Sequence, residues 1–224
     1  MSKTKAHDTV VILDFGSQYT QLIARRVREA GVYCEILPYH ASVEVIAAHN
    51  PRGVILSGGP SSVYDENAPR LPKKFLEELS CPVLGICYGL QVLAADLGGQ
   101  VQPSSRREYG YAKLKIVDPA SPLFTDLPEE MDVWMSHGDQ VTEIPPGFHI
   151  TALSDNALNA FENLSKRIYG VQFHPEVAHT PLGAQVLRNF LNSVCQVQAD
   201  WSPQAIISEQ VQKIKDEIEK LWEV

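Results

Sequence analysis

Short apolar runs alternate with helical patterns over the first hundred residues of the chain. Four runs rich in β-branched and other apolar side chains indicate buried strands, at residues 10–13, 33–37, 54–57 and 83–86. Between them, apolar residues recur at intervals of three and four, which predicts helices over residues 19–30, 43–49 and 73–79. This alternation is typical of an α/β fold: a doubly wound, mainly parallel sheet with helices on both faces.

The pattern changes in the second half of the chain. Three further strand-like runs, at residues 111–117, 149–154 and 168–173, have shorter connections that are often polar or contain proline. Such connections suit antiparallel or mixed strands beside the parallel core. A last apolar helical pattern covers residues 182–194. We therefore expect residues 8–198 to form one domain around a mixed sheet.

The remaining residues, 199–224, carry a separate pattern. Ser202 and Pro203 suit the N-cap and first position of a helix, and apolar residues then follow at 4-3-4-3 spacing from Ile207 to Leu221. A helix this amphipathic needs a surface to pack on. Two interpretations stay open at this point: the helix docks on the same domain, or it begins another domain.

A cysteine lies where the fourth strand-like run ends and a helical pattern begins. Residues 85–89 are Gly-Ile-Cys-Tyr-Gly, with glycines two positions before and two positions after Cys87. A strand-to-helix turn of this kind strains the backbone of its central residue, and the glycines leave room for the close turn. The positive end of the helix dipole would favour the thiolate over the thiol. Cys87 is therefore the candidate nucleophile.

A histidine and a glutamate follow the last strand-like run, in Phe-His-Pro-Glu at residues 173–176. Residues two apart in an extended chain face the same side, so the Cα atoms of His174 and Glu176 would lie roughly 6.5 to 7 Å apart. The carboxylate can then accept one imidazole N–H while the other nitrogen faces a nucleophile. A lone His-x-Glu is more often a surface pair; combined with the turn at Cys87, it predicts a catalytic triad.

A glycine turn, Ser-Gly-Gly-Pro at residues 57–60, ends the third strand-like run. Its backbone N–H groups lie at the carboxyl end of a strand, and we expect those of Gly59 and Tyr88 to form an oxyanion hole. Phosphate binding is the alternative for such a turn. It is disfavoured because no Gly-Lys-Ser/Thr follows the glycines.

These motifs, in this order, resemble the class I glutamine amidotransferases, which have a flavodoxin-like fold and a Cys-His-Glu triad that releases ammonia from glutamine. Within that class, further segments are similar to the amidotransferase domains of GMP synthetases, and the similarity runs from about residue 10 to about residue 203. The segments are Asp-Phe-Gly-Ser-Gln-Tyr (14–19), Arg-Glu-Tyr-Gly-Tyr (107–111), Val-Trp-Met-Ser-His-Gly-Asp (133–139) and Pro-Glu-Val-Ala-His-Thr (175–180).

The resemblance implies a role for each matching residue. Cys87 is the nucleophile, His174 the general base and acid, and Glu176 the group that orients the imidazole. The implied glutamine-binding residues are Gly58, Gly59, Gln91, Ser136, His137, Gly138 and Asp139. A carboxylate and backbone N–H groups suit the two charges of an amino-acid zwitterion. The implied reaction is hydrolysis of L-glutamine to glutamate and ammonia.

The resemblance also implies a partner. In GMP synthetases the ammonia passes to an ATP-pyrophosphatase domain, in cis or in trans, where xanthosine monophosphate (XMP) is activated with ATP and magnesium. The Ser-Gly-Gly-Val-Asp-Ser-Ser loop with which the family binds ATP is absent from this sequence. We therefore expect no cofactor in this domain, residues 199–224 to be the linker and first helix of a synthetase domain, and a homodimer to form through the full-length enzyme.

Charge and composition limit other functions. The 224 residues carry a net charge of −8 with no basic cluster beyond Arg25-Arg26 and Arg106-Arg107, which argues against nucleic-acid binding. No apolar run approaches the roughly 20 residues that span a bilayer. Arg25, Arg26 and Arg28 are expected on the solvated face of a helix.

The four cysteines indicate a reducing compartment. They lack the spacing of metal ligands, and the chain has no apolar signal region, so we expect a cytoplasmic protein without a disulfide or a metal site. Cys34, Cys81 and Cys195 are expected to be small buried residues.

Two other functions stay open. One is the amidotransferase subunit of another pathway, such as anthranilate or carbamoyl phosphate synthesis, or a glutamyl-tail hydrolase; the segments similar to GMP synthetases disfavour it. The other is a catalytically silent module retained for partner binding. The presence of all three triad residue types disfavours that module.

Overall fold

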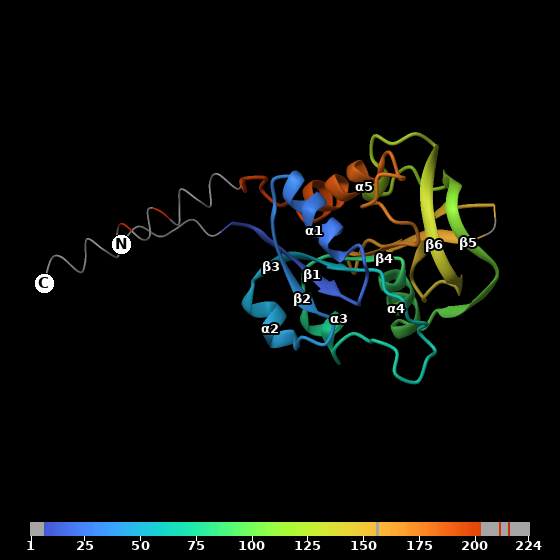
Figure 1. The fold of residues 1–224 in the computed structure, drawn as a ribbon, viewed down its shortest axis with the longest axis horizontal. Helices are drawn as coiled ribbons and strands as arrows, with labels where there is room; N and C mark the ends of the chain where they lie inside the picture. Colours follow the sequence, from blue (N-terminus) through green and yellow to red (C-terminus); the bar gives the residue numbers. More distant parts are fainter. Residues whose placement is uncertain (1–6, 156, 203–210, 212–214, 216–224) are drawn as a thin grey trace, which may run out of the picture.

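The computed structural model describes residues 7–155 and 157–202, together with residues 211 and 215. Within these residues, nine strands form one sheet in the order β2-β1-β3-β4-β9-β8-β7-β5-β6 (Figure 1). The strands are β1 (Thr9–Asp14), β2 (Tyr33–Pro38), β3 (Pro51–Leu56), β4 (Val83–Ile86), β5 (Gln100–Ile116), β6 (Glu130–Glu143), β7 (His149–Leu153), β8 (Leu158–Asn163) and β9 (Ile168–Val171).

The sheet has a parallel part and an antiparallel part. Strands β2, β1, β3, β4 and β9 pair in parallel, whereas β8, β7, β5 and β6 extend the sheet through antiparallel pairs. The mixed sheet expected from the sequence is confirmed, including the change of pattern after the first four strands. Because β9 lies beside β4, the carboxyl ends of two strands distant in sequence meet at one edge.

Helices cover both faces of the parallel part (Figure 1). On one face lie α1 (Thr20–Glu29) and α5 (Gly183–Asn189); on the other lie α2 (Val43–Ala48), α3 (Phe75–Glu78) and α4 (Tyr88–Asp96). Successive residues of a strand face opposite sides, so Val10 and Ile12 pack with α1 while Val11 and Leu13 pack with α2. The strands are apolar at nearly every position because both faces are buried.

Two strands were not predicted, and one begins earlier than predicted. β8 contains the buried polar residues Asn159, Glu162 and Asn163, which hide its apolar pattern. β6 does alternate, with Met131 buried and its neighbours on either side exposed, whereas the motif over residues 133–139 predicts only a binding segment. β5 begins at Gln100 instead of residue 111, because its first half is polar and owes its strand form to pairing with β6.

The predicted helix over residues 182–194 is α5 followed by a π-helical turn, Phe190–Val194. The predicted helix from Ser202 onward falls almost wholly outside the described residues. Along the part of the chain that the structure describes, none of the helices has the length and apolar character that crossing a membrane requires.

Candidate active site

Cys87 occupies the turn between β4 and α4. Its backbone has φ 53° and ψ −106°, in the left-handed half of the map that a non-glycine residue rarely enters. The glycines on either side are sterically required. A Cβ on Gly85 would lie 2.6 Å from the backbone of Gly89, and a Cβ on Gly89 would lie 2.5 Å from the Leu56 carbonyl oxygen. The close approach of β4, α4 and β3 therefore forces the turn at which the thiol sits.

His174 and Glu176 follow β9, which is the neighbour of β4 in the sheet. The Nδ1 atom of His174 lies 2.7 Å from Oε1 of Glu176, and the two side chains are 4% and 0% exposed. Parallel pairing of β4 with β9 places the imidazole beside Cys87, close enough for the thiol to affect the pKa of the ring. The structure thus brings the three predicted triad residues together at one edge of the sheet.

The surroundings of His174 favour its protonated form. Burial opposes the charge, but the interactions with Cys87 and Glu176 outweigh it and raise the pKa of His174 well above its ordinary value of 6.5. The thiol of Cys87 also lies 3.8 Å from the Ser136 carbonyl oxygen, which can accept its hydrogen. The array therefore suits an imidazolium that donates a proton to a leaving group.

Backbone contacts hold His174 against β6. The His174 N–H donates to the Trp134 carbonyl at 3.1 Å. The Thr180 hydroxyl donates to the His174 carbonyl at 2.7 Å and accepts from the Trp134 N–H at 3.0 Å. The ring of Tyr19 packs edge-to-face on the imidazole, with ring centroids 5.1 Å apart. These three residues lie in the motif segments named above, but sequence reasoning assigned them no role.

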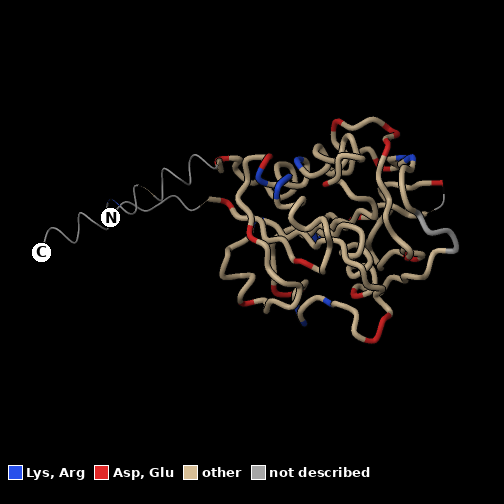
Figure 2. The backbone as a smooth tube through the Cα atoms, viewed as in Figure 1, with Lys and Arg blue, Asp and Glu red and all other residues tan. Residues whose placement is uncertain are grey.

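Arg26 contradicts its predicted place on a solvated helix face. Arginines do lie along α1 (Figure 2), and Arg25 and Arg26 both pair with Glu29. However, Nε of Arg26 also donates to the Glu176 carbonyl at 3.0 Å, which ties α1 to the segment after β9. The sequence carries no signal of this contact, since the helical pattern alone places Arg26 among solvated neighbours.

The glycine turn after β3 borders the triad. A Cβ on Gly58 would lie 3.3 Å from Cε1 of His174 and 3.7 Å from Cβ of Cys87, and a Cβ on Gly59 would lie 2.7 Å from the Phe15 carbonyl oxygen. Within the described residues, the N–H groups of Gly59 and Tyr88 donate no hydrogen bond. Tyr88 is the first residue of α4, where the N–H has no partner inside the helix. Both donors are available for an oxyanion.

The other predicted glutamine-binding residues lie on β6 and α4. The Gln91 amide nitrogen donates to the Asp139 carbonyl at 3.0 Å and to Oε1 of Gln172 at 3.3 Å. This amide group is therefore already engaged in hydrogen bonds within the protein. The Asp139 carboxylate accepts hydrogen bonds from the hydroxyls of Ser62 and Tyr64. The segment from Ser136 to Asp139 thus has the Ser136 carbonyl beside the Cys87 thiol at one end and the hydrogen-bond-accepting carboxylate of Asp139 at the other.

The other cysteines differ from Cys87 in their surroundings. Burial raises the pKa of the Cys34 thiol to about 11 and raises that of Cys195 as well, and it also raises the pKa of the partly buried Cys81. Burial stabilises the neutral thiol and makes these positions poor nucleophiles.

The fold and the triad geometry define a class of protein, and comparison with known families agrees. Residues 11–194 match the family model described as glutamine amidotransferase class-I. The chain belongs to this family.

Proteins of known name place the chain more narrowly. It is 52% identical over 210 residues to the glutamine-hydrolysing GMP synthase of Caldicellulosiruptor saccharolyticus, covering 93% of this chain and 41% of that protein. The corresponding enzyme of Pelodictyon phaeoclathratiforme is 52% identical over 214 residues, covering 92% of this chain and 41% of that protein. The chain thus spans about two-fifths of the length of these relatives.

A solved structure shares the fold. The crystal structure of a Thermoplasma acidophilum protein, assigned as a GMP synthase subunit, superposes with a TM-score of 0.77 at 29% identity, covering 92% of this chain and 98% of the other. A glutamine amidotransferase from Thermotoga maritima, at 21% identity and a TM-score of 0.67, covers 85% of this chain and 99% of its own and shares the fold.

Proposed function

We propose that this chain hydrolyses L-glutamine to glutamate and ammonia as the glutaminase component of a GMP-forming enzyme, a carbon-nitrogen ligase of purine biosynthesis. The observation that carries the proposal is the convergence of Cys87 and the hydrogen-bonded pair His174–Glu176 at the adjacent ends of β4 and β9. The relatives named as glutamine-hydrolysing GMP synthases support the narrower assignment.

The first half of the proposed reaction makes a thioester. The Cys87 thiolate attacks the side-chain amide carbon of glutamine and forms a C–S bond, while the carbonyl oxygen becomes an oxyanion that accepts the N–H groups of Gly59 and Tyr88. The His174 imidazolium gives its proton to the amide nitrogen. The C–N bond then breaks, ammonia leaves, and the γ-glutamyl group stays on sulfur.

The second half returns the enzyme to its starting state. Neutral His174 takes a proton from a water molecule, whose oxygen attacks the thioester carbon. Collapse of the tetrahedral intermediate breaks the C–S bond and releases glutamate and the thiolate. Glu176, bonded to Nδ1, keeps the ring in one orientation and stabilises its positive charge throughout.

Substrate binding is proposed for the residues around Asp139. Its carboxylate accepts two hydroxyl hydrogen bonds, from Ser62 and Tyr64, and would exchange or share them with the α-ammonium group of glutamine. Backbone N–H groups of Gly58 or Gly59, and of the segment Ser136, His137 and Gly138, are the proposed donors to the α-carboxylate. Gln91 acts mainly by holding the Asp139 backbone.

We further propose that the ammonia is used by an ATP-pyrophosphatase domain, in cis or in trans, to aminate XMP activated with ATP and magnesium in the cytoplasm. Residues 8–198 would form the glutaminase domain and residues 199–224 the linker and first helix of the synthetase domain. The coverage of only 41% of the relatives is consistent with a second domain in those proteins.

A glutaminase assay tests the proposal. Glutamate release is measured for this chain alone, and then with an added GMP synthetase ATP-pyrophosphatase domain, XMP and Mg-ATP. We expect weak Cys87-dependent release by the chain alone and stimulation in the complete mixture. Stimulation only by an anthranilate or carbamoyl phosphate synthetase component would overturn the GMP assignment. Absence of release under every condition would favour a silent binding module.

A further inference from the structure

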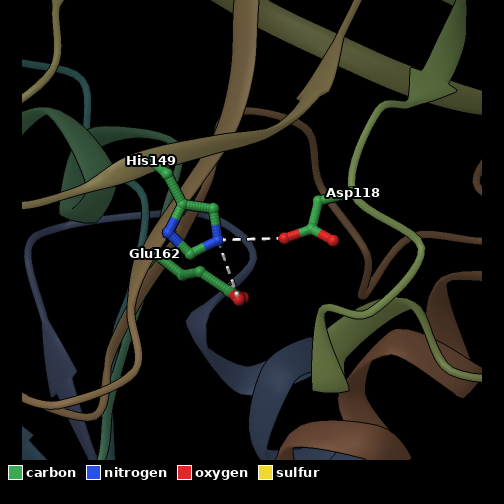
Figure 3. Close-up of side chains that lie close together, drawn as sticks. All are labelled: Asp118, His149 and Glu162. Atoms are coloured by element: carbon green, nitrogen blue, oxygen red, sulfur yellow. Dashed lines mark hydrogen bonds and ion pairs between the residues drawn. The ribbon is translucent and has the colours of Figure 1, made fainter.

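Three donor side chains converge on the antiparallel part of the sheet, on elements that do not carry the triad (Figure 3). His149 begins β7 and lies opposite Glu162 of β8 in the strand pairing. Asp118 follows the end of β5, and its backbone N–H donates to the Thr151 carbonyl of β7 at 3.2 Å. One ligand atom from each of the three residues lies within 4.8 Å of the other two.

The two distances from His149 in this cluster are close to those between neighbouring ligands of a metal ion. Nε2 of His149 lies 3.0 Å from Oδ2 of Asp118 and 3.4 Å from Oε1 of Glu162. In a tetrahedral zinc site with bonds of about 2.0–2.1 Å, neighbouring donor atoms are roughly 3.3 Å apart. In Figure 3 both carboxylates point at the same ring nitrogen. Two of the three donor pairs therefore already have about the spacing of a zinc site, and the third pair lies within 4.8 Å.

In each carboxylate, the oxygen that does not face His149 accepts a hydrogen bond from the protein. Oε2 of Glu162 accepts the Ser121 hydroxyl at 2.6 Å, and Oδ1 of Asp118 accepts the Ala120 N–H at 3.0 Å. These contacts leave Oε1 of Glu162 and Oδ2 of Asp118 facing the centre of the cluster. Such outer contacts orient the ligands in metal sites and strengthen ion binding.

The hydrogen bonds of the protein leave this arrangement incomplete. Nε2 of His149 lies 3.0 Å from Oδ2 of Asp118, with which it forms a hydrogen bond. Oε1 of Glu162, in a side chain that is 0% exposed, makes only the longer 3.4 Å contact to Nε2 and has no hydrogen bond among the described residues. A divalent cation at the centre of the cluster would bind this oxygen directly.

We propose that Asp118, His149 and Glu162 bind a divalent transition-metal ion of the Zn²⁺ type, with water completing its coordination. One imidazole nitrogen and two carboxylate oxygens suit zinc better than magnesium or calcium, which prefer six or more oxygen ligands. The half-exposed ring of His149 gives the ion access from solvent. The ion would tie the end of β5 to the β7–β8 pair and act structurally.

The test uses the full chain, freed of metal with EDTA and carrying Cys87→Ser so that the catalytic thiol does not bind the ion. Zinc binding is measured by calorimetry, and the melting temperature is measured with and without zinc. We expect one equivalent to bind and to raise the melting temperature. Co²⁺ in place of Zn²⁺ should give visible absorption bands without a sulfur-to-metal charge-transfer band.

Variants at the cluster decide whether the ion binds there. Glu162→Gln and His149→Gln should each weaken zinc binding by at least about tenfold, and Ser121→Ala by a similar factor through misorientation of Glu162. His49→Gln removes an imidazole elsewhere and should leave binding unchanged. If Glu162→Gln fails to fold in EDTA, Asp118→Asn, at the partly exposed edge, replaces it.

Two results would overturn the proposal. The first is zinc binding by the donor variants as tight as that of the parent. The second is a parent protein that neither binds zinc nor melts at a higher temperature in its presence; in either case the cluster is only an ion-pair network. Because the readouts are affinity and melting temperature, they do not depend on glutaminase activity, and the proposed function can fail or stand separately.

Discussion

Two histidines in this molecule are paired with buried glutamates, and their surroundings differ. His174 is 4% exposed and contacts Glu176, two residues along the same segment, through Nδ1. The side chain of His149 is 43% exposed and contacts Glu162 of the neighbouring strand through Nε2, with Asp118 as a second carboxylate. The imidazole of His174 lies between a carboxylate and a thiol. The imidazole of His149 contacts two carboxylate oxygens through a single nitrogen.

This difference shows what a histidine–carboxylate pair needs in order to do chemistry. His174 has a nucleophile on one side and an orienting carboxylate on the other, in a site largely closed to water. Among the described residues, His149 has acceptors only on the side of Nε2, an arrangement suited to binding a cation. The predictions below test this contrast, in order of expected size.

Removal of the thiol should have the largest effect. Cys87→Ala abolishes the covalent step and should lower glutamine turnover by at least about 10³-fold. Glutamate release by the variant is compared with that of Cys34→Ala, which removes a buried thiol outside the triad. Full turnover by a folded Cys87→Ala variant would contradict the mechanism. It would also contradict the proposed difference between His174, which acts beside a nucleophile, and His149, which does not.

Loss of the orienting carboxylate should cost less. Glu176→Gln keeps the size of the side chain but removes its charge, and turnover should fall on the order of 10²-fold. Glu176 raises the pKa of His174, so its removal lowers that pKa. Deprotonation of the imidazolium then begins at lower pH, and the alkaline limb of the rate profile should move toward acid. An unmoved limb would show that Glu176 does not stabilise the charged ring.

The hydroxyl of Thr180 should have a smaller effect. Thr180→Val leaves the His174 carbonyl and the Trp134 N–H without their partner, at a cost of about 1–3 kcal/mol in unfolding free energy. Turnover should fall several-fold because the His174 backbone is less firmly held. Thr142→Val is the matched control, since Thr142 is exposed and makes a single 3.4 Å bond. Equal effects of the two variants in urea unfolding and turnover would remove Thr180 from this positioning role.

His149 should matter least to catalysis. In metal-free protein, His149→Gln removes a ring that contacts two carboxylates and should cost about 1 kcal/mol in unfolding free energy. Turnover per folded molecule should fall less than in Thr180→Val, with His49→Gln as the control. A loss as large as that of Glu176→Gln would mean that the two histidine sites are coupled.

The sequence was sufficient where the signal is local. The strands and helices around residues 10–97 follow from apolar periodicity, and the turn at Cys87 follows from the two glycines that flank it at a distance of two residues. His174 and Glu176 are two residues apart, so their contact could be predicted; the extended chain assumed for it was wrong, because β9 ends at Val171 and the pair lies in the loop and turn that follow. The roles of these residues remain proposals, whereas their arrangement is a feature of the structure.

Other features depend on contacts that no local pattern carries. The first half of β5 is polar and forms a strand through its pairing with β6. Arg26 reaches Glu176 across 150 positions of sequence, and Thr180 connects two segments that only the fold brings together. The polar residues of β8 are typical of a loop in the sequence, and only their contacts in the fold show that they form a strand.

By itself, then, the sequence determined the α/β class, the turn at Cys87 and the local pair of His174 and Glu176, because each follows from backbone geometry over a few residues. Only the tertiary structure decided that β9 lies beside β4, which brings the imidazole to the thiol. It also decided that Asp118, His149 and Glu162 meet, since residues on three different strands or their ends become neighbours only when antiparallel pairing fixes their register.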